Sequence, residues 1–252
     1  MSINFYDKVA KKFGGYAFSK NHIGSRSECP KGDPEKIFKK KLLGLATNSS
    51  TAFDAGCGDG KFAFQIAKHF LRIIGIDTSK ELLKIAKQKQ KIFHVANISF
   101  RYQNADDTSF PDASFDIIFS RRGSTAFSEF HRLLKFGGYY IGIEIGEKDC
   151  QEIKEIFGRG QGYKEWDTSR LKNDKRKLND VGFEVVSIKD YFCDEYFKSY
   201  KDFDLFLQGV PIFENFNSEK DRKLLEEYVA EFTTEKGIRL QRHRVVLVAK
   251  KM

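Results

Sequence analysis

The sequence predicts an α/β fold with a seven-stranded, mostly parallel sheet, and three observations lead to this prediction. From residue 51 onward, short apolar segments alternate with amphipathic ones, as strands and helices do around a parallel sheet. The chain has 252 residues, 40% of them hydrophobic, which is enough to bury such a core. A glycine-rich stretch at 56–60 follows the first apolar segment, and it is typical of a strand that turns directly into a helix.

The period of the apolar residues gives the expected elements in order. Strands are predicted at 51–54, 72–77, 98–103, 115–120, 139–145, 183–189 and 245–249. Helices are predicted between them at 60–69, 79–90, 124–135, 148–157 and 164–180. Helices on both faces of the sheet would make a three-layer domain.

Two further segments are expected to be helical and to lie outside this sheet. Residues 1–47 are expected to form an N-terminal helical cap, interrupted by glycines and prolines. Residues 195–236 are too many for a plain connection between the last two strands, and they hold two amphipathic stretches separated by Pro211. We expect a helical insert there, inside a core that runs from 48 to 252 and forms one globular unit with the cap.

The net charge of +9, from 44 basic and 35 acidic residues, raises the question of a nucleic-acid partner. Part of the excess comes from the run KIFKKKLL, which holds the lysines between Lys36 and Lys41. Apolar residues recur within this run, so it favours a solvated helix face above a buried stripe over an RNA-binding patch. RNA stays open as an alternative partner to a small molecule.

The rest of the composition argues against several classes of site. No apolar run is long enough to span a bilayer, and the N-terminal residues lack the apolar core of a secretory signal, so we expect a cytoplasmic protein with no membrane partner. Four cysteines, Cys29, Cys57, Cys150 and Cys193, lie far apart and have no histidine at metal-ligand spacing. We therefore expect reduced thiols, no disulfide framework and no metal site.

The strongest functional signal is the loop Asp54-Ala-Gly56-Cys57-Gly58-Asp59-Gly60. Its glycines allow the backbone to approach a ligand closely, at the carboxyl end of a strand and the N-terminus of a helix. Lys61 stands where the dinucleotide pattern G-x-G-x-x-G needs its third glycine, so that pattern fails. Asp54 would repel a pyrophosphate, but it suits a ligand that carries an ammonium and a sulfonium.

These motifs and their order resemble those of class I S-adenosylmethionine-dependent methyltransferases over about residues 50–146. The resemblance implies a Rossmann-like fold, S-adenosyl-L-methionine as cofactor and S-adenosyl-L-homocysteine as product. In that family the glycine loop wraps the methionine part of the cofactor, a role that falls here to Asp54, Gly56, Cys57 and Gly58. We interpret Cys57 as a small side chain facing the cofactor and not as a nucleophile.

The end of the second predicted strand points to the ribose. Asp77 stands there, and a carboxylate at this place can accept hydrogen bonds from both ribose hydroxyls, which is also the role that the resemblance gives it. The alternative, that Asp77 caps the next helix, is better filled by Thr78 or Ser79. Thr78 is assigned to the cofactor site together with Asp77.

Adenine needs an acceptor for its amino group and a donor for a ring nitrogen. Asn104 or Asp106, with the amide of Ala105, fits this need after the third predicted strand. Asn104 stands where the family often has aspartate, and it keeps an acceptor. Ser120, at the end of the fourth strand, completes the predicted cofactor set.

The acceptor side is expected at Ser120-Arg121-Arg122-Gly123, because methyl transfer from a sulfonium mainly requires two partners to be positioned and desolvated. The N/D-P-P-Y/F stretch of exocyclic-amine methyltransferases is missing at this place, as is a Pro-Cys pair. Arg121 and Arg122 are candidates for binding a carboxylate or phosphate, and the alternative for one of the two is pairing with an acid of the cap. His22 is a candidate base, or a surface residue of a loop.

Three functional hypotheses follow. The leading one is an enzyme that methylates a small molecule at nitrogen or oxygen, and the alternative is an RNA base methyltransferase that uses the basic N-terminal region. A third, a binding protein without turnover, is disfavoured because the loop and Asp77 are intact.

Three N-terminal aromatic residues, Tyr6, Phe13 and Tyr16, are candidates for a lid over the cofactor or for core packing.

Overall fold

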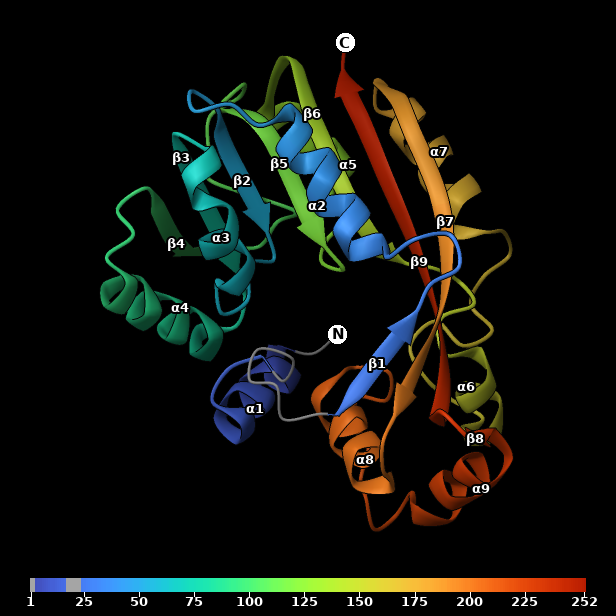
Figure 1. Cartoon of the computed structure of the whole chain (residues 1–252). Helices are drawn as coiled ribbons and strands as arrows, with labels where there is room; N and C mark the ends of the chain where they lie inside the picture. The colour runs from blue at the N-terminus through green and yellow to red at the C-terminus, as the bar shows by residue number, and fades with distance from the viewer. Residues whose placement is uncertain (1–2, 17–23) are drawn as a thin grey trace.

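The computed structural model describes residues 3–16 and 24–252, which form the helices and strands of Figure 1. The strands are β1 (Ser25–Glu28), β2 (Thr51–Ala55), β3 (Arg72–Asp77), β4 (Ile98–Tyr102), β5 (Phe115–Arg121), β6 (Leu134–Ile145), β7 (Phe183–Phe197), β8 (Thr233–Thr234) and β9 (Gly237–Lys251). The helices are α1 (Ile3–Phe13), α2 (Pro34–Leu45), α3 (Lys61–Ile66), the short 3-10 helix η2 (Ala67–His69), α4 (Lys80–Phe93), α5 (Phe127–Leu133), α6 (Gln151–Phe157), α7 (Arg170–Asp180), α8 (Tyr200–Gly209) and α9 (Arg222–Phe232).

One open sheet carries the fold, with the strand order β1-β7-β9-β6-β5-β2-β3-β4 and with β8 paired to β9. The strands from β4 across to β6 pair in parallel, whereas β9, β7 and β1 pair antiparallel beyond them. The mostly parallel α/β sheet is confirmed. The predicted count of seven strands is wrong, because the described residues hold nine.

The two missed strands carry no apolar alternation that would reveal them. β1 has the sequence SRSE and all four residues are exposed, while β8 is two exposed threonines long. Both form by pairing with an existing edge, β1 with β7 and β8 with β9. Backbone pairing to a long neighbour, and not burial of their own side chains, makes them strands.

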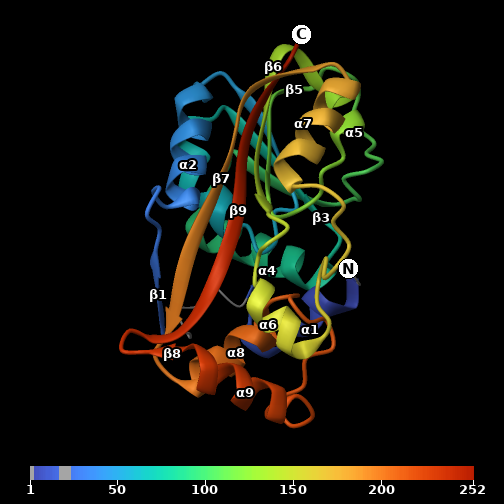
Figure 2. The same cartoon turned by 90° about the vertical axis from the view of Figure 1, so that its right-hand side faces the viewer.

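Helices cover both faces of the sheet, as predicted. On one face, apolar residues of α2, α3 and α4 pack on alternate residues of the strands, and on the other face those of α5 and α7 pack on the residues between. Figure 2 shows α2 and α7 on opposite sides of the sheet. The structure therefore has three layers.

The lysine run lies on α2, which is one of these core layers. Asp33 caps this helix by accepting hydrogen bonds from the amides of Glu35 and Lys36, and Pro34 occupies the first turn. The buried stripe of α2 is Pro34, Phe38 and Leu42, and Lys36 and Lys40 are exposed. The run is thus a helix with a solvated face above a buried stripe.

β7 and β9 are much longer than the predicted strands at 183–189 and 245–249. Each has 15 residues, and their extra halves continue as an antiparallel pair below the parallel core (Figure 1). α6, α8 and α9 pack on this extension in a separate apolar cluster. The two helices predicted within 195–236 are present as α8 and α9.

A disulfide joins Cys29, directly after β1, to Cys193 in β7. The expectation of reduced thiols is wrong for this pair, while Cys57 and Cys150 are free and buried. The two half-cystines are 164 residues apart in sequence, and the antiparallel register that opposes Glu28 to Asp194 makes them neighbours. Within residues 3–16 and 24–252, no helix is long and apolar enough to cross a membrane.

Candidate active site

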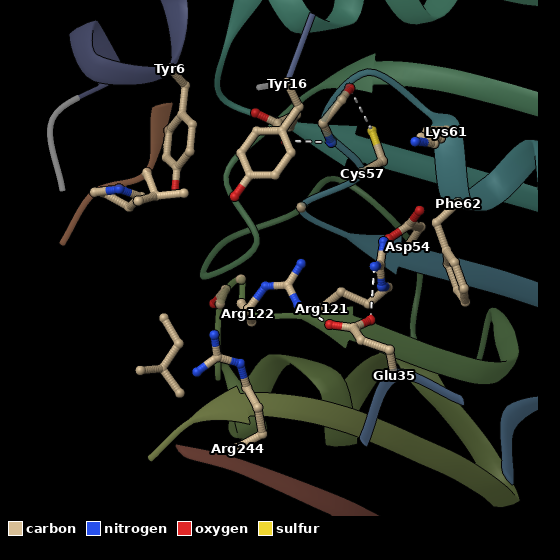
Figure 3. A pocket seen from close by; sticks show the side chains of 18 of the residues that line it. Tyr6, Tyr16, Glu35, Asp54, Cys57, Lys61, Phe62, Arg121, Arg122 and Arg244 are labelled. Atoms are coloured by element: carbon tan, nitrogen blue, oxygen red, sulfur yellow. Dashed lines mark hydrogen bonds and ion pairs between the residues drawn. The ribbon is translucent and has the colours of Figure 1, made fainter. Parts of the chain in front are cut away.

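A cavity of about 660 Å³ lies at the carboxyl ends of the parallel strands (Figure 3). The loops after β2, β3, β4 and β5 line one side of it, and the N-terminal end of α2, the segment 210–212 and the extended parts of β7 and β9 line the other. Ligand sites in open α/β sheets lie at this edge, and the volume is in the range of small-molecule pockets.

The glycine loop is fixed to the end of β3 by its own amides. Gly56 and Cys57 donate to the carbonyl of Ile76 at 3.0 and 2.9 Å, and Gly58 donates to Oδ2 of Asp77 at 2.8 Å. Gly58 has a positive φ of 54°, and a Cβ built on it would meet nothing within 4 Å. The loop therefore presents bare backbone to open space, as a nucleoside-binding loop must.

Asp77 is held in place by two amides and keeps capacity for a ligand. Its Oδ1 accepts from the amide of Ser79 at 2.8 Å, in addition to the Gly58 contact, and each carboxylate oxygen retains a second lone pair. Ser79 caps α4 by accepting from the amide of Leu82, so the capping role belongs to Ser79 and not to Asp77. Burial raises the pKa of Asp77, although hydrogen bonds from the amides of Ser79, Gly58 and Thr78 oppose this.

Asp54 is the most deeply buried acid of the loop, with an exposed fraction of 3%. Burial raises its pKa to about 7, and the charge of Asp77 adds to this, whereas the guanidinium of Arg121 works against it. A positively charged ligand group beside this carboxyl would stabilise its ionised form. A cation bound beside Asp54 would therefore lower the pKa of this carboxyl.

Arg121 and Arg122 both pair with Glu35, an acid in the first turn of α2. Arg121 Nη2 donates to Glu35 Oε2 at 2.9 Å, and Arg122 pairs with the other oxygen. Burial raises the pKa of Glu35, but Arg122 and Arg121 outweigh it and lower the pKa to about 2. The Arg121 guanidinium also lies 4.3 Å from the centroid of the Phe62 ring. Both arginines thus pair with an acid of the N-terminal region, the alternative that the sequence offered for one of them.

Two further arginines line the cavity from β9 and were missed as site residues. Arg242 donates to Asp149 Oδ1 at 3.1 Å and to Glu195 Oε2 at 2.7 Å, and Arg244 lies 2.6 Å from the same Asp149 oxygen. Burial raises the pKa of Asp149, but Arg242 and Arg244 outweigh it and hold the pKa well below its ordinary value. The signal in the sequence is their spacing of two, which places both side chains on one face of a strand.

Most of the predicted cofactor residues come together at this cavity. The residues that line it are Asp54, Gly56, Cys57, Gly58, Asp77, Thr78, Asn104 and Ala105. Asp106 and Ser120 do not line it, because the Asp106 side chain accepts from Ser124 at 3.2 Å and Ser120 is fully buried. His22 lies outside the described residues.

Cys57 lines the cavity with a buried thiol. Burial raises the pKa of this thiol well above its ordinary value, which keeps it neutral and unreactive as a nucleophile. Tyr6 and Tyr16 also line the cavity, with ring centroids 6.3 Å apart. Phe13 and Tyr6 both pack against Phe5 and Val9 in a small apolar cluster.

Comparisons with known proteins agree with this geometry. A family model described as a methyltransferase domain matches residues 53–142. Demethylmenaquinone methyltransferase of Staphylococcus saprophyticus is 27% identical over 192 residues, which cover 63% of this chain and 82% of the relative. The uncharacterized methyltransferase YcgJ of Bacillus subtilis is 32% identical over 124 residues, which cover 44% of this chain and 49% of YcgJ.

Solved structures share the fold. The crystal structure of YcgJ has a TM-score of 0.62 at 16% identity, covering 86% of this chain and 98% of YcgJ. Geranyl diphosphate C-methyltransferase of Streptomyces coelicolor, solved with Mg²⁺, geranyl-S-thiolodiphosphate and S-adenosyl-L-homocysteine, has a TM-score of 0.55 at 18% identity, covering 86% of this chain and 75% of that one. The glycine loop, the acid that ends β3 and these matches together support a class I S-adenosylmethionine-dependent methyltransferase, an enzyme whose family match covers residues 53–142.

Proposed function

We propose that this enzyme transfers a methyl group from S-adenosylmethionine to a small-molecule acceptor inside the cavity. The observation that carries the proposal is the extent of the cavity, which reaches from the glycine loop at Gly56 and Gly58 to Arg244 and the segment 210–212. A donor and an acceptor at its two ends would share one enclosed space, where water is excluded and the reacting atoms are held in line.

The loop side of the cavity fits the cofactor that the family uses. The free lone pairs of Asp77 suit two ribose hydroxyls, and the side chain of Asn104 with the amide of Ala105 suits the adenine edge. The open space above Gly58 leaves room for the part of the cofactor between its ribose and its amino-acid end. Asp54 is the acid that would pair with the ammonium of that end. When bound, the cofactor supplies a methyl group already activated on sulfur.

A small acceptor is better supported than RNA. The exposed lysines of α2 lie on its outer face, whereas Arg242 and Arg244 lie inside the cavity and are paired with carboxylates, so the described residues give no shared basic patch. Demethylmenaquinone methyltransferase and geranyl diphosphate C-methyltransferase are also named for small-molecule acceptors. Transfer to nitrogen or oxygen remains a prediction from the sequence.

Calorimetric titration of S-adenosylhomocysteine tests the proposal. We expect saturable binding to the wild-type protein and binding at least about tenfold weaker for Asp77→Ala, because charge-assisted hydrogen bonds to the ribose are lost. Asp180→Ala, at the exposed end of α7, is the matched control and should bind as the wild type does. A wild-type protein that does not bind S-adenosylhomocysteine would overturn the proposal.

The acceptor class needs a second measurement. Release of S-adenosylhomocysteine from S-adenosylmethionine is followed with a fraction of small metabolites and, separately, with total RNA. Turnover with the small-molecule fraction alone is expected. Turnover with RNA alone, falling steeply as salt is raised, would favour the RNA alternative.

A further inference from the structure

Three guanidinium groups from two parts of the cavity wall lie close enough to repel one another. Arg122 follows β5, while Arg242 and Arg244 extend from β9, and Figure 3 shows Arg244 directed toward Arg122. Their mutual repulsion is felt at Arg244, where burial lowers the pKa and the charges of Arg242 and Arg122 lower it further. Several cations gathered in a buried space are costly unless anions compensate them.

The carboxylates of the chain compensate Arg242 but leave Arg244 incompletely bonded. Arg242 uses Asp149 and Glu195, as described above. Arg244 uses only Nη1, which donates to the carbonyl of His243 at 2.8 Å and approaches Asp149. Its Nε and Nη2 have no hydrogen-bond partner among the described residues, although the side chain is only 8% exposed.

Arg122 is also incompletely bonded, and its backbone is strained. Its side chain pairs with Glu35 through Nη1, and no partner among residues 3–16 and 24–252 engages its Nε or Nη2. Its φ is 59°, a left-handed value that is costly for any residue but glycine, and its amide is held to the carbonyl of Ile143 at 2.7 Å. Strain of this kind is concentrated at binding and catalytic sites.

The unused donors have the geometry of an anion site. Nε and Nη2 of one guanidinium form the fork that binds a carboxylate or a phosphate through two parallel hydrogen bonds. Val210 and Ile212 give the same cavity a buried apolar wall. The two surfaces together would accept a molecule with a charged end and an apolar body.

On this basis, which rests on the function proposed above, we propose that the methyl acceptor is a small organic anion. Its carboxylate or phosphate binds between Arg244 and Arg122, and its apolar part lies against Val210 and Ile212. The anion completes the hydrogen bonds that the chain leaves open and places the rest of the acceptor toward the cofactor. The carboxylate of the cofactor could occupy the same arginine site, and the test below distinguishes it from the carboxylate or phosphate of the acceptor.

The test uses the protein saturated with S-adenosylhomocysteine, so that the cofactor carboxylate is already accommodated. Benzoate, phenyl phosphate and neutral benzyl alcohol, which share one ring, are titrated by calorimetry and by ligand-observed NMR. We expect saturable binding of at least one of the two anions, and binding of benzyl alcohol at least about tenfold weaker. Which anion binds tighter distinguishes a carboxylate acceptor from a phosphate ester.

Variants assign the binding to the arginines. Arg244→Gln should weaken the anion about tenfold or more and change the affinity for S-adenosylhomocysteine by less than about twofold. Arg122→Gln, at a more accessible position, should do the same and covers the case in which Arg244→Gln does not fold. Arg222→Gln, in the exposed part of α9, is the matched control and should bind as the wild type does.

Three results would overturn the inference. Equal binding of benzyl alcohol and both anions by the wild type would remove the anion site. Equal loss of anion and S-adenosylhomocysteine affinity in Arg244→Gln would assign the guanidinium to the cofactor carboxylate instead. If the wild type failed to bind S-adenosylhomocysteine, the proposed function would fall first, and the inference with it.

Discussion

At the scale of single residues, the ionisation of Asp54 connects cofactor binding to pH. Burial raises its pKa to about 7, so the Asp54 side chain must lose a proton before it can pair with a cation as a carboxylate. We expect the affinity for S-adenosylmethionine to fall as the pH drops below about 7, by up to about tenfold per pH unit. Calorimetry between about pH 5.5 and pH 8 measures this, and Asp54→Asn should bind weakly and without the pH dependence. A flat wild-type affinity over this range would contradict the assignment.

The same carboxyl should reduce the stability of the cofactor-free protein. Its pKa in the fold, about 7, lies above the ordinary value of 3.8, so its stabilising contribution is complete below that ordinary value and is lost as the pH rises through 7. Asp54→Asn cannot ionise, and it should therefore raise the melting temperature over wild type by roughly 2 °C or more at about pH 8. The difference should shrink at about pH 5. A larger gain at the lower pH would show that burial of the charge is not the cause.

The residues of the site were predictable to the extent that they follow one another in the chain. Asp54, Gly58 and Asp77 stand in a motif whose order and spacing indicate the cofactor, and all three line the cavity. Arg244 and Asp149 are 95 positions apart, and only the pairing of β6 with β9 brings them together. A side chain whose neighbours come from distant strands leaves no local pattern.

At the scale of elements, α1 is attached to the core at the start of α4. Ser79 Oγ donates to Asp7 Oδ1 at 2.6 Å, and the amide of Glu81 donates to the same oxygen at 3.3 Å. Asp7 thus places a carboxylate at a helix N-terminus, a favourable position. The contact holds the helix that carries Tyr6 over the cavity.

Removing this attachment should loosen the lid and leave the sheet intact. Asp7→Ala should weaken binding of S-adenosylhomocysteine by about two- to fivefold, the effect of losing about 0.5–1 kcal/mol of docking energy. Lys8→Ala, at the exposed neighbouring position, is the matched control. Calorimetry gives the affinities and thermal unfolding the stability. A fall in melting temperature of several degrees with unchanged affinity would mean that α1 stabilises the core and does not cover the site.

The elements of the parallel core were predictable because each buries apolar side chains with a clear period. β2, β3 and β5 are found within about one residue of their predicted bounds, since both faces of a central strand are buried and its apolar run ends where burial ends. The extensions of β7 and β9 carry charged residues such as Asp194 and Arg242, which form ion pairs with residues of the neighbouring strand. These charged residues interrupt the apolar alternation, so the hydrophobic pattern of the sequence does not predict the extensions.

At the scale of the whole molecule, the Cys29–Cys193 disulfide ties the N-terminal segment to the long antiparallel extension. Both half-cystines line the cavity on the side of the arginines, away from the glycine loop. The bond closes a loop of 164 residues, and a loop of this length constrains the unfolded chain by up to about 5 kcal/mol. Cofactor binding and overall stability should therefore respond differently when it is removed.

We expect the double variant Cys29→Ser/Cys193→Ser to unfold at a clearly lower urea concentration than the wild type, by about 2–5 kcal/mol in free energy of unfolding. It should still bind S-adenosylhomocysteine, because Asp54, Gly58 and Asp77 lie on loops that the disulfide does not hold. Cys150→Ser is the matched control for loss of a buried thiol. In denaturant without reductant, the wild type should show two reactive thiols, Cys57 and Cys150. Four reactive thiols, together with equal urea midpoints for the wild type and the double variant, would refute the disulfide. If the bond forms, the arginine side of the cavity is fastened to the fold independently of the cofactor side, so an acceptor site can change while the donor site stays the same.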